Sequence, residues 1–153
     1  ITTLKMRTEK DFKEFIALLN EHEVRYLIVG GFAYSFYAEP RFTKDIDFFV
    51  EASTKSADKM LNVLEEFGFK NVGITKDDFL KSDQIIQLGI APLRIDIITS
   101  ISGVSFNEAW NNYTVGKYGN IPANFISKSD LIKNKKATGR AQDIADIEKL
   151  KKI

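Results

Sequence analysis

Residues 29–51 read VGGFAYSFYAEPRFTKDIDFFVE and end in two acids that flank one isoleucine inside an apolar run. Side chains on a strand alternate between its two faces, so Asp45 and Asp47 are expected on one face and Ile46 on the other. Two interpretations follow. The acids are either solvated at a strand end, or they are two carboxylates that share a cation.

The cation interpretation rests on distance and charge. Two strand residues separate the Cα atoms of Asp45 and Asp47 by roughly 7 Å, which lets their oxygens bind one ion. Like charges this close repel each other unless a positive charge lies between them. Mg²⁺ takes carboxylate oxygens and usually completes its shell with substrate phosphates. An isolated Asp-x-Asp is nevertheless more often an ordinary strand end, because short motifs have many false positives.

Two further features favour a binding site. Gly30-Gly31 follows the β-rich run 26–29 and precedes a predicted helix at 32–38. Glycines let the backbone approach a ligand, and a helix N-terminus offers unpaired N–H groups to phosphate, although a glycine pair alone is more often a tight turn. In LRIDIITS, residues 93–100, Asp96 lies on another predicted strand, either as an edge acid, as the partner of Arg94, or as a third metal-binding carboxylate.

The remaining pattern predicts a compact α+β domain with helices around one mixed sheet. Helical periodicity favours helices at 9–22, 56–67 and 106–111, and one or two helices in 129–153 with a break near Gly139. Strand patterns are predicted at 26–29, 45–50, 84–90, 93–99 and 113–118, with a hairpin turn at Ala91-Pro92. The whole chain, 1–153, is interpreted as one domain with its C-terminal helices packed on it.

Composition excludes several classes of protein. Of 153 residues, 22 are Lys or Arg and 21 are Asp or Glu, so no net charge draws the chain to nucleic acid or membranes. No apolar run reaches the ~18 residues of a membrane span, and no secretory signal is recognised. The absence of cysteine excludes disulfides and thiolate metal sites. The sequence thus predicts a soluble, cytoplasmic protein.

Gly-Gly, Asp-x-Asp and a later strand Asp together resemble the DNA polymerase β-like nucleotidyltransferase superfamily. The segment EPRFTKDIDFFV and the closing LIKNKKATGRAQDIADIEKL are similar to its small bacterial members, including the nucleotidyltransferase-like toxins of abortive-infection systems. The resemblance implies a nucleotidyltransferase fold and, for a toxin, an antitoxin partner. Phe32 stands where many active members have a serine that contacts the triphosphate.

The resemblance also implies roles for individual residues. Asp45, Asp47 and Asp96 would be catalytic and would bind Mg²⁺, with two ions expected and Mn²⁺ as a substitute. The nucleotide would contact residues in two segments of the chain. In the first segment these are Gly30, Gly31, Arg41, Thr43 and Lys44, and in the tail they are Lys136 and Arg140.

The basic residues of the tail have a second interpretation. A continuous helix would align Lys133, Lys136 and Arg140 on one face, where they would reach the triphosphate or an RNA acceptor. Basic runs are usually solvated faces, however, and Arg140 with Asp143 has the spacing of a helical ion pair. On that interpretation Asp143 and Asp146 are structural.

Two functions remain open. The first is metal-dependent transfer of a nucleoside monophosphate from an NTP to a hydroxyl of tRNA, a protein or a small molecule. The second is a catalytically inactive module that binds nucleotide or another protein, which Phe32 and the short chain favour. Because the chain leaves little room for an acceptor domain, either an open cleft or a partner protein is expected to hold the acceptor.

Overall fold

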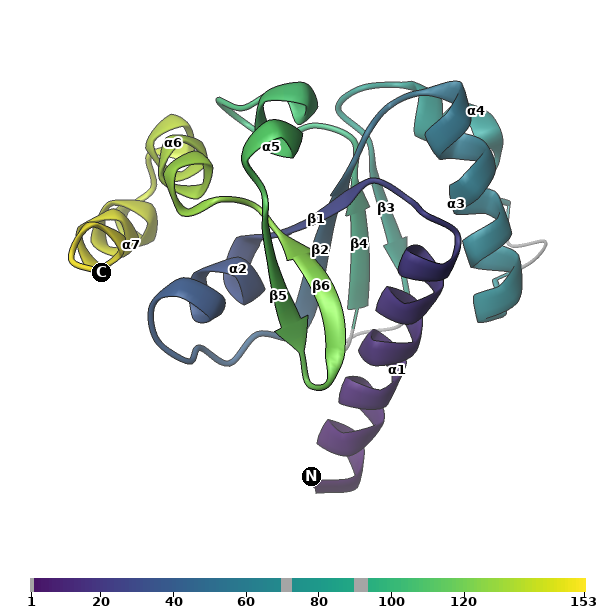
Figure 1. The fold of residues 1–153 in the computed structure, drawn as a ribbon, viewed down its shortest axis with the longest axis horizontal. Coiled ribbons are helices and arrows are strands. Elements are labelled where there is room, and N and C mark those ends of the chain that lie inside the picture. Colours follow the sequence, from purple (N-terminus) through teal and green to yellow (C-terminus); the bar gives the residue numbers. More distant parts are fainter. Residues whose placement is uncertain (1, 70–72, 90–93) are drawn as a thin grey trace.

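The computed structural model describes residues 2–69, 73–89 and 94–153, with side chains from Lys10 onward (Figure 1). Helices and strands alternate along these ranges. The helices are α1 (Thr2–Glu21), α2 (Gly30–Tyr37), α3 (Thr54–Phe67), α4 (Lys76–Leu80), α5 (Phe106–Asn112), α6 (Lys128–Thr138) and α7 (Ala141–Lys151). The strands are β1 (Tyr26–Val29), β2 (Asp45–Val50), β3 (Ile85–Leu88), β4 (Arg94–Ile98), β5 (Thr114–Tyr118) and β6 (Ile121–Phe125).

The six strands form one mixed sheet in the order β3-β4-β2-β1-β6-β5. Strand β2 pairs antiparallel with β1 and parallel with β4, so it lies between them at the centre. The predicted hairpin strands β3 and β4 pair antiparallel. The predicted turn of this hairpin, Ala91-Pro92, lies outside the described residues.

One face of the sheet is covered by α1 and α3. Phe15 of α1 packs on Phe48 of β2 with ring centroids 5.3 Å apart and on Phe67 of α3 at 5.1 Å. Ile46 on β2 and Ile95 on β4 are buried beside them. Because strand side chains alternate between the two faces, the residues next to Ile46 and Ile95 along these strands point to the other face.

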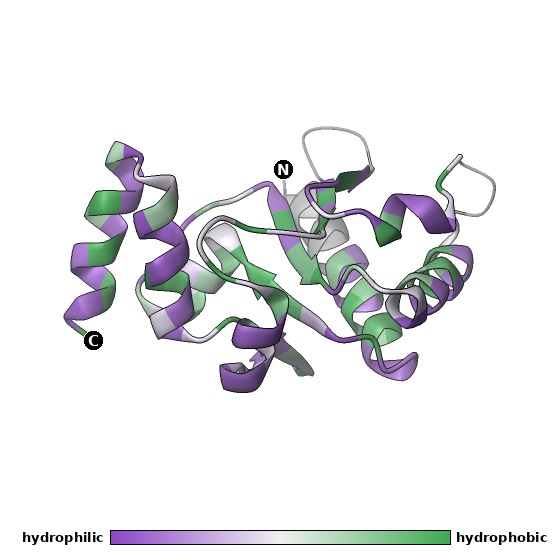
Figure 2. Ribbon diagram, turned by 90° about the horizontal axis from the view of Figure 1, so that it is seen from above, coloured by the Kyte–Doolittle hydropathy of each residue, from purple (hydrophilic) through white to green (hydrophobic). Residues whose placement is uncertain are grey.

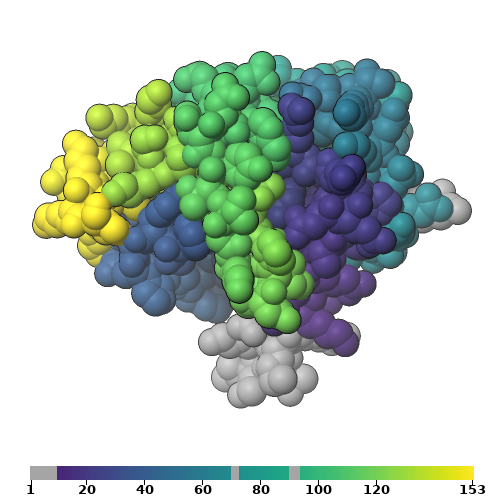
Figure 3. All heavy atoms as spheres, viewed as in Figure 1, coloured from purple at the N-terminus to yellow at the C-terminus, as the bar shows by residue number. Residues whose placement is uncertain are grey.

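The opposite face is covered in two parts. Helix α5 packs on Phe49 through Phe106, with ring centroids 5.2 Å apart. Helix α2 lies against β1 and β2, and the α6–α7 pair packs against α2 at the edge of the molecule (Figures 1 and 3). The strands are mostly hydrophobic, whereas α6 and α7 mix hydrophobic and hydrophilic residues (Figure 2). Asp45 and Asp47 lie on this second face of the sheet.

The structure confirms the predicted mixed α+β fold and adds three features. Helix α1 begins at Thr2, earlier than the predicted residue 9, and neither α4 nor β6 was predicted. Strand β6 was missed because Pro122 and Asn124 weaken its β pattern. It nevertheless pairs with both β1 and β5, and so joins the last hairpin to the sheet.

The tail contains two helices and not one. Gly139 adopts the left-handed conformation with φ 63° at the end of α6, and Arg140 is the N-cap of α7. The expected alignment of Lys133, Lys136 and Arg140 on one continuous helix is therefore wrong. The physical reason is the glycine, which ends the helix before Arg140.

No helix among the described residues is long and apolar enough to cross a membrane.

Candidate active site

The three predicted acids meet on one face of the sheet. Asp47 on β2 lies opposite Asp96 on the parallel strand β4, and Asp45 lies opposite Arg94 in the same register. Asp45 and Asp47 share a face because they are two residues apart on one strand. The strands that carry these acids, β2 and β4, are neighbours in one mixed sheet.

Asp47 is the carboxylate with the most perturbed titration. Burial, together with the charge of Asp96 and a hydrogen bond shared with it, raises the pKa of Asp47 to about 7. Asp96 is itself buried, with 7% of its surface exposed. A negative charge on Asp47 is costly there, because the side chain is buried beside another carboxylate. Strands β2 and β4 thus place a carboxyl group with a raised pKa at the centre of the acid cluster.

Arg94 supplies the positive charge that the acids require. Its Nε donates to Asp96 Oδ1 at 2.8 Å, and its Nη2 donates to Asp96 Oδ2 at 3.2 Å and to Asp45 Oδ2 at 2.9 Å. The hydrogen bond to Asp96 raises the pKa of Arg94 above its ordinary value. The guanidinium thus bridges two acids and makes no hydrogen bond to Asp47, the third.

The glycine pair lies directly against the acids. Val29 pairs with Asp47 across β1 and β2, so α2 begins beside the carboxylate. A Cβ atom at Gly30, whose φ is +66°, would overlap Asp47 Oδ2. A Cβ at Gly31 would meet the side chain of Thr43 at 3.4 Å. The turn therefore needs glycine at the first position both for its backbone conformation and for space.

Gly30→Ala is expected to lower the free energy of unfolding in two ways. A left-handed residue with a Cβ costs about 1–2 kcal/mol, and the overlap with Asp47 adds to this cost. Gly139→Ala is the matched control, because Gly139 has φ +63° and its added Cβ would only meet Lys136 O at 3.7 Å. Urea unfolding of both variants measures the difference. Equal losses in the two variants would contradict the close approach of Gly30 to Asp47.

The acid cluster offers oxygen ligands only, as Mg²⁺ and Mn²⁺ prefer. Among the described residues, no three His, Asp or Glu side chains are arranged so that they could hold a metal ion. The donor chemistry fits the ion, since paired carboxylates with a raised pKa gain from a cation. In the structure, Asp45 and Asp96 accept hydrogen bonds from the Arg94 guanidinium. Asp45, Asp47 and Asp96 are the residues that would hold the metal.

A second charged cluster joins α6 and α7 to the loop before β2. Arg41 donates two hydrogen bonds to Asp146, at 2.6 and 3.0 Å, and its guanidinium lies over the Tyr34 ring at 3.9 Å. Lys135 Nζ donates to Asp146 Oδ2 at 2.8 Å, and Gln142 donates to Asp146 Oδ1 at 2.9 Å. Asp146 is 1% exposed. Although burial acts to raise its pKa, these hydrogen bonds outweigh it and lower the pKa of Asp146.

Sequence reasoning missed the role of Lys135. It lies in the run KNKK, where nothing distinguishes it from its exposed neighbours, yet it is buried with 7% of its surface exposed. Only its place opposite Asp146 and Asp143 separates it from Lys136, which is exposed. The tertiary contact between α6 and α7 selects one lysine of the run.

The other predicted nucleotide-binding residues lie in two places. Thr43 faces Gly31 and donates a hydrogen bond to the carbonyl of Asp45, and Lys44 is exposed next to Asp45. Arg140 is bound to Asp143 at 2.8 Å, and this hydrogen bond, with burial opposing it, holds the pKa of Asp143 at about 2. Phosphate contacts by Arg41, Lys136 and Arg140 remain predictions.

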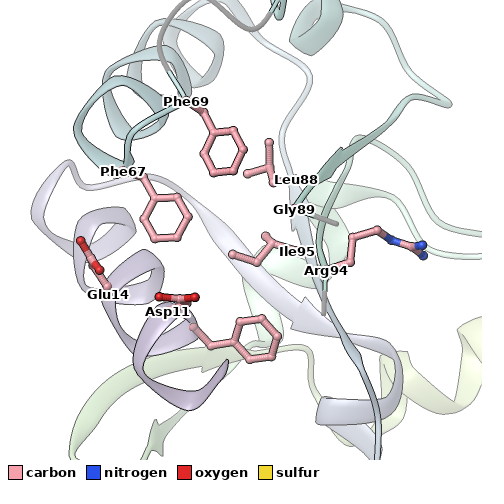
Figure 4. A pocket seen from close by; sticks show the side chains of 9 residues that line it. Asp11, Glu14, Phe67, Phe69, Leu88, Gly89, Arg94 and Ile95 are labelled. Atoms are coloured by element: carbon pink, nitrogen blue, oxygen red, sulfur yellow. The ribbon is translucent and has the colours of Figure 1, made fainter. Parts of the chain in front are cut away.

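A cavity of about 270 Å³ lies on the face of the sheet opposite the acids. Phe67, Phe69, Ile95 and Arg94 are among the residues that line it, but the Arg94 guanidinium points away from the other labelled side chains (Figure 4). It hydrogen-bonds Asp45 and Asp96 instead. The cavity is separated from the three carboxylates by the sheet itself. The cavity is therefore not part of the acid site.

Comparison with family models gives one assignment. Residues 8–152 match the model described as "Nucleotidyltransferase of unknown function (DUF6036)". The match includes the glycine pair, all three acids and both tail helices. No curated protein matches the chain significantly.

The fold is also found among solved structures. The chain is similar to the lincomycin-bound crystal structure of the lincosamide antibiotic adenylyltransferase LnuA, with a TM-score of 0.60 and 20% identity. The alignment covers 93% of this chain and 95% of that one. At this identity the likeness shows a shared fold.

Proposed function

The chain belongs to the nucleotidyltransferase family of unknown function (DUF6036), and on that premise we propose that it transfers a nucleoside monophosphate from an NTP to a hydroxyl acceptor in a metal-dependent reaction. The observation that carries this proposal is the meeting of Asp45, Asp47 and Asp96 on one face of adjacent strands. The glycine turn at the start of α2 lies against the same face. Carboxylates and a phosphate-binding turn at one place are what this reaction requires.

The residues divide the work as follows. Asp45 and Asp47 would hold Mg²⁺ or Mn²⁺, which neutralises phosphate charge when bound. The backbone at Gly30 and Gly31 binds the triphosphate, and Thr43 and Lys44 lie close enough in the chain to contact it. Asp96 accepts the proton of the acceptor hydroxyl, while the oxygen of that hydroxyl forms a bond to the α-phosphorus. The bond from that phosphorus to the bridging oxygen breaks, and pyrophosphate leaves.

The acceptor belongs to the same proposal. The acceptor is a hydroxyl on tRNA, on a protein or on a small molecule. The similar fold of a lincosamide adenylyltransferase supports the small-molecule class, because that protein binds an antibiotic in its crystal structure. For a large acceptor, a partner protein would complete the site.

An inactive nucleotide-binding module is the second candidate. It is favoured by Arg94, which forms ion pairs with Asp45 and Asp96 where a metal ion would bind. Phe32 is weaker evidence against catalysis. Its ring packs on Phe12 and Tyr118, with ring centroids 5.8 Å apart in each case. The phenylalanine therefore lacks the hydroxyl of a serine at this turn, but its side chain has a role in packing.

Incubation with each α-labelled NTP, Mg²⁺ and a cell extract tests the transfer. We expect label to appear in one class of molecule, namely RNA, protein or small compounds. Asp96→Asn should keep much of the Mg²⁺-NTP binding, because Asp45 and Asp47 remain, but lose at least about a hundredfold in transfer rate, because it lacks the proton acceptor. Asp45→Asn should lose both binding and transfer.

The labelling experiment and a calorimetric titration together separate the two candidates. Calorimetric titration with Mg²⁺-NTP that shows binding, with no label transferred to any acceptor, would support the inactive module. Nucleotide affinity that is indifferent to Mg²⁺ would contradict the metal-dependent proposal. Transfer by Asp96→Asn at the rate of the parent would remove Asp96 from the reaction.

A further inference from the structure

Arg94 shares its ligands with the cation that the proposed reaction requires. Its guanidinium uses both carboxylate oxygens of Asp96 and one of Asp45. These are charge-assisted hydrogen bonds, and the same oxygen lone pairs would bind a metal. A divalent ion and Arg94 therefore compete for Asp45 and Asp96.

The side chain of Arg94 is placed so that it can change partners. It starts β4 and is 31% exposed, whereas Asp96 beside it is 9% exposed by the same side-chain measure. The guanidinium projects from the sheet on the side opposite the aromatic cavity, as Figure 4 shows. Turning the guanidinium away from the acids therefore leaves the apolar layer of Ile95 and Phe67 in place.

A triphosphate offers Arg94 a replacement for the carboxylates it would give up. The planar guanidinium binds phosphate oxygens as well as carboxylate oxygens, with the same paired geometry. The proposed phosphate site at Gly30 borders Asp47, which is next to Asp96 in the sheet. Metal alone would leave the displaced guanidinium without a partner, but metal with a polyphosphate would not.

We propose that Arg94 is a positioning residue that occupies the carboxylates until metal and nucleotide arrive together, and that it then binds the polyphosphate. This inference rests on the proposed function. It makes metal and nucleotide binding cooperative, because each ligand removes part of the cost of the other. In the metal-free protein the Arg94 guanidinium balances the charges of Asp45 and Asp96. The acid cluster therefore does not bind divalent ions in the absence of nucleotide.

Two titrations of the full chain test this role, one with Mn²⁺ alone and one with the preformed Mn²⁺-tripolyphosphate complex. Arg94→Met keeps the length of the side chain and removes the competing charge. We expect it to bind Mn²⁺ alone more tightly than the parent, on the order of tenfold. It should bind the tripolyphosphate complex more weakly than the parent, by a similar factor. The two affinities thus change in opposite directions.

Thermal unfolding supplies a second measurement. In metal-free buffer, Arg94→Met should melt roughly 3–6 °C below the parent, because the acids lose their counter-ion. Saturating Mn²⁺ should raise the melting temperature of the variant more than that of the parent. Arg25→Met is the control for loss of one positive charge. Arg25 is exposed, lies over the Trp110 ring at 5.6 Å and precedes β1 at the end of that strand away from Gly30, so this variant should leave both affinities unchanged.

Arg94→Lys extends the test if the methionine variant folds poorly. Lysine keeps the charge and loses the fork, so its affinity for Mn²⁺ should lie between those of the parent and Arg94→Met. A lower melting temperature in either variant, with Mn²⁺ affinity equal to the parent, would overturn the inference and leave Arg94 a structural ion-pair partner. Since the titration with Mn²⁺ alone involves no nucleotide, that failure is distinct from a parent that binds no NTP.

Discussion

Asp146→Ala is expected to lower the free energy of unfolding by about 3–5 kcal/mol, because it leaves Arg41 and Lys135 without their shared carboxylate. Asp146 is 1% exposed and Lys135 is 7% exposed, so water does not readily replace the lost partner. The contact joins α7 to the loop before β2 through Arg41. Urea unfolding at neutral pH measures the loss.

Lys149→Ala on the same helix is the matched control. Lys149 pairs with Glu39, and both side chains are more than half exposed. An exposed ion pair contributes little to stability, so this variant should stay near the parent. Similar losses in the two variants would show that burial does not set the strength of the Asp146 cluster.

Because α6 and α7 pack on α2, Asp146→Ala should also weaken binding of nucleotide at the start of α2.

Asp47→Asn is expected to stabilise the metal-free protein at pH 8 by about 2–4 kcal/mol. Burial and the nearby charge of Asp96 raise the pKa of Asp47 to about 7 in the folded protein, whereas the unfolded value is about 4. The folded state therefore holds the proton more tightly, and stability of the parent falls as the pH rises from about 4 to about 7. The asparagine has no charge to lose.

The sign of this effect can be measured directly. The stability of Asp47→Asn relative to the parent should be greatest above pH 7 and should vanish near pH 4, where both side chains are neutral. Saturating Mg²⁺ with NTP should reverse the order at pH 8, because only the parent keeps the charged metal ligand. If the difference in free energy of unfolding between variant and parent is the same at pH 4 and pH 8, Asp47 is not a carboxyl group with a raised pKa.

The residues of the acid cluster could be identified from local sequence pattern. Strand periodicity placed Asp45 and Asp47 on one face, and the apolar residues around Asp96 placed it on a second strand, which the structure shows to be adjacent. The glycine pair was also recognised from local pattern, as a turn between a strand and a helix, and the structure adds the left-handed conformation of Gly30. These features depend on residues close in sequence, where the period of two and backbone sterics apply without knowledge of the fold.

The pairing of charges depends on contacts between distant parts of the chain. Arg41 and Asp146 are 105 residues apart in the chain, and Arg94 and Asp45 are 49 apart. Nothing in the local pattern distinguishes buried Lys135 from exposed Lys136, because an ion pair forms wherever packing brings opposite charges together away from water. Strand β6 likewise gains its place from pairing with β1 and β5, which supplies the hydrogen bonds that its own sequence favours only weakly.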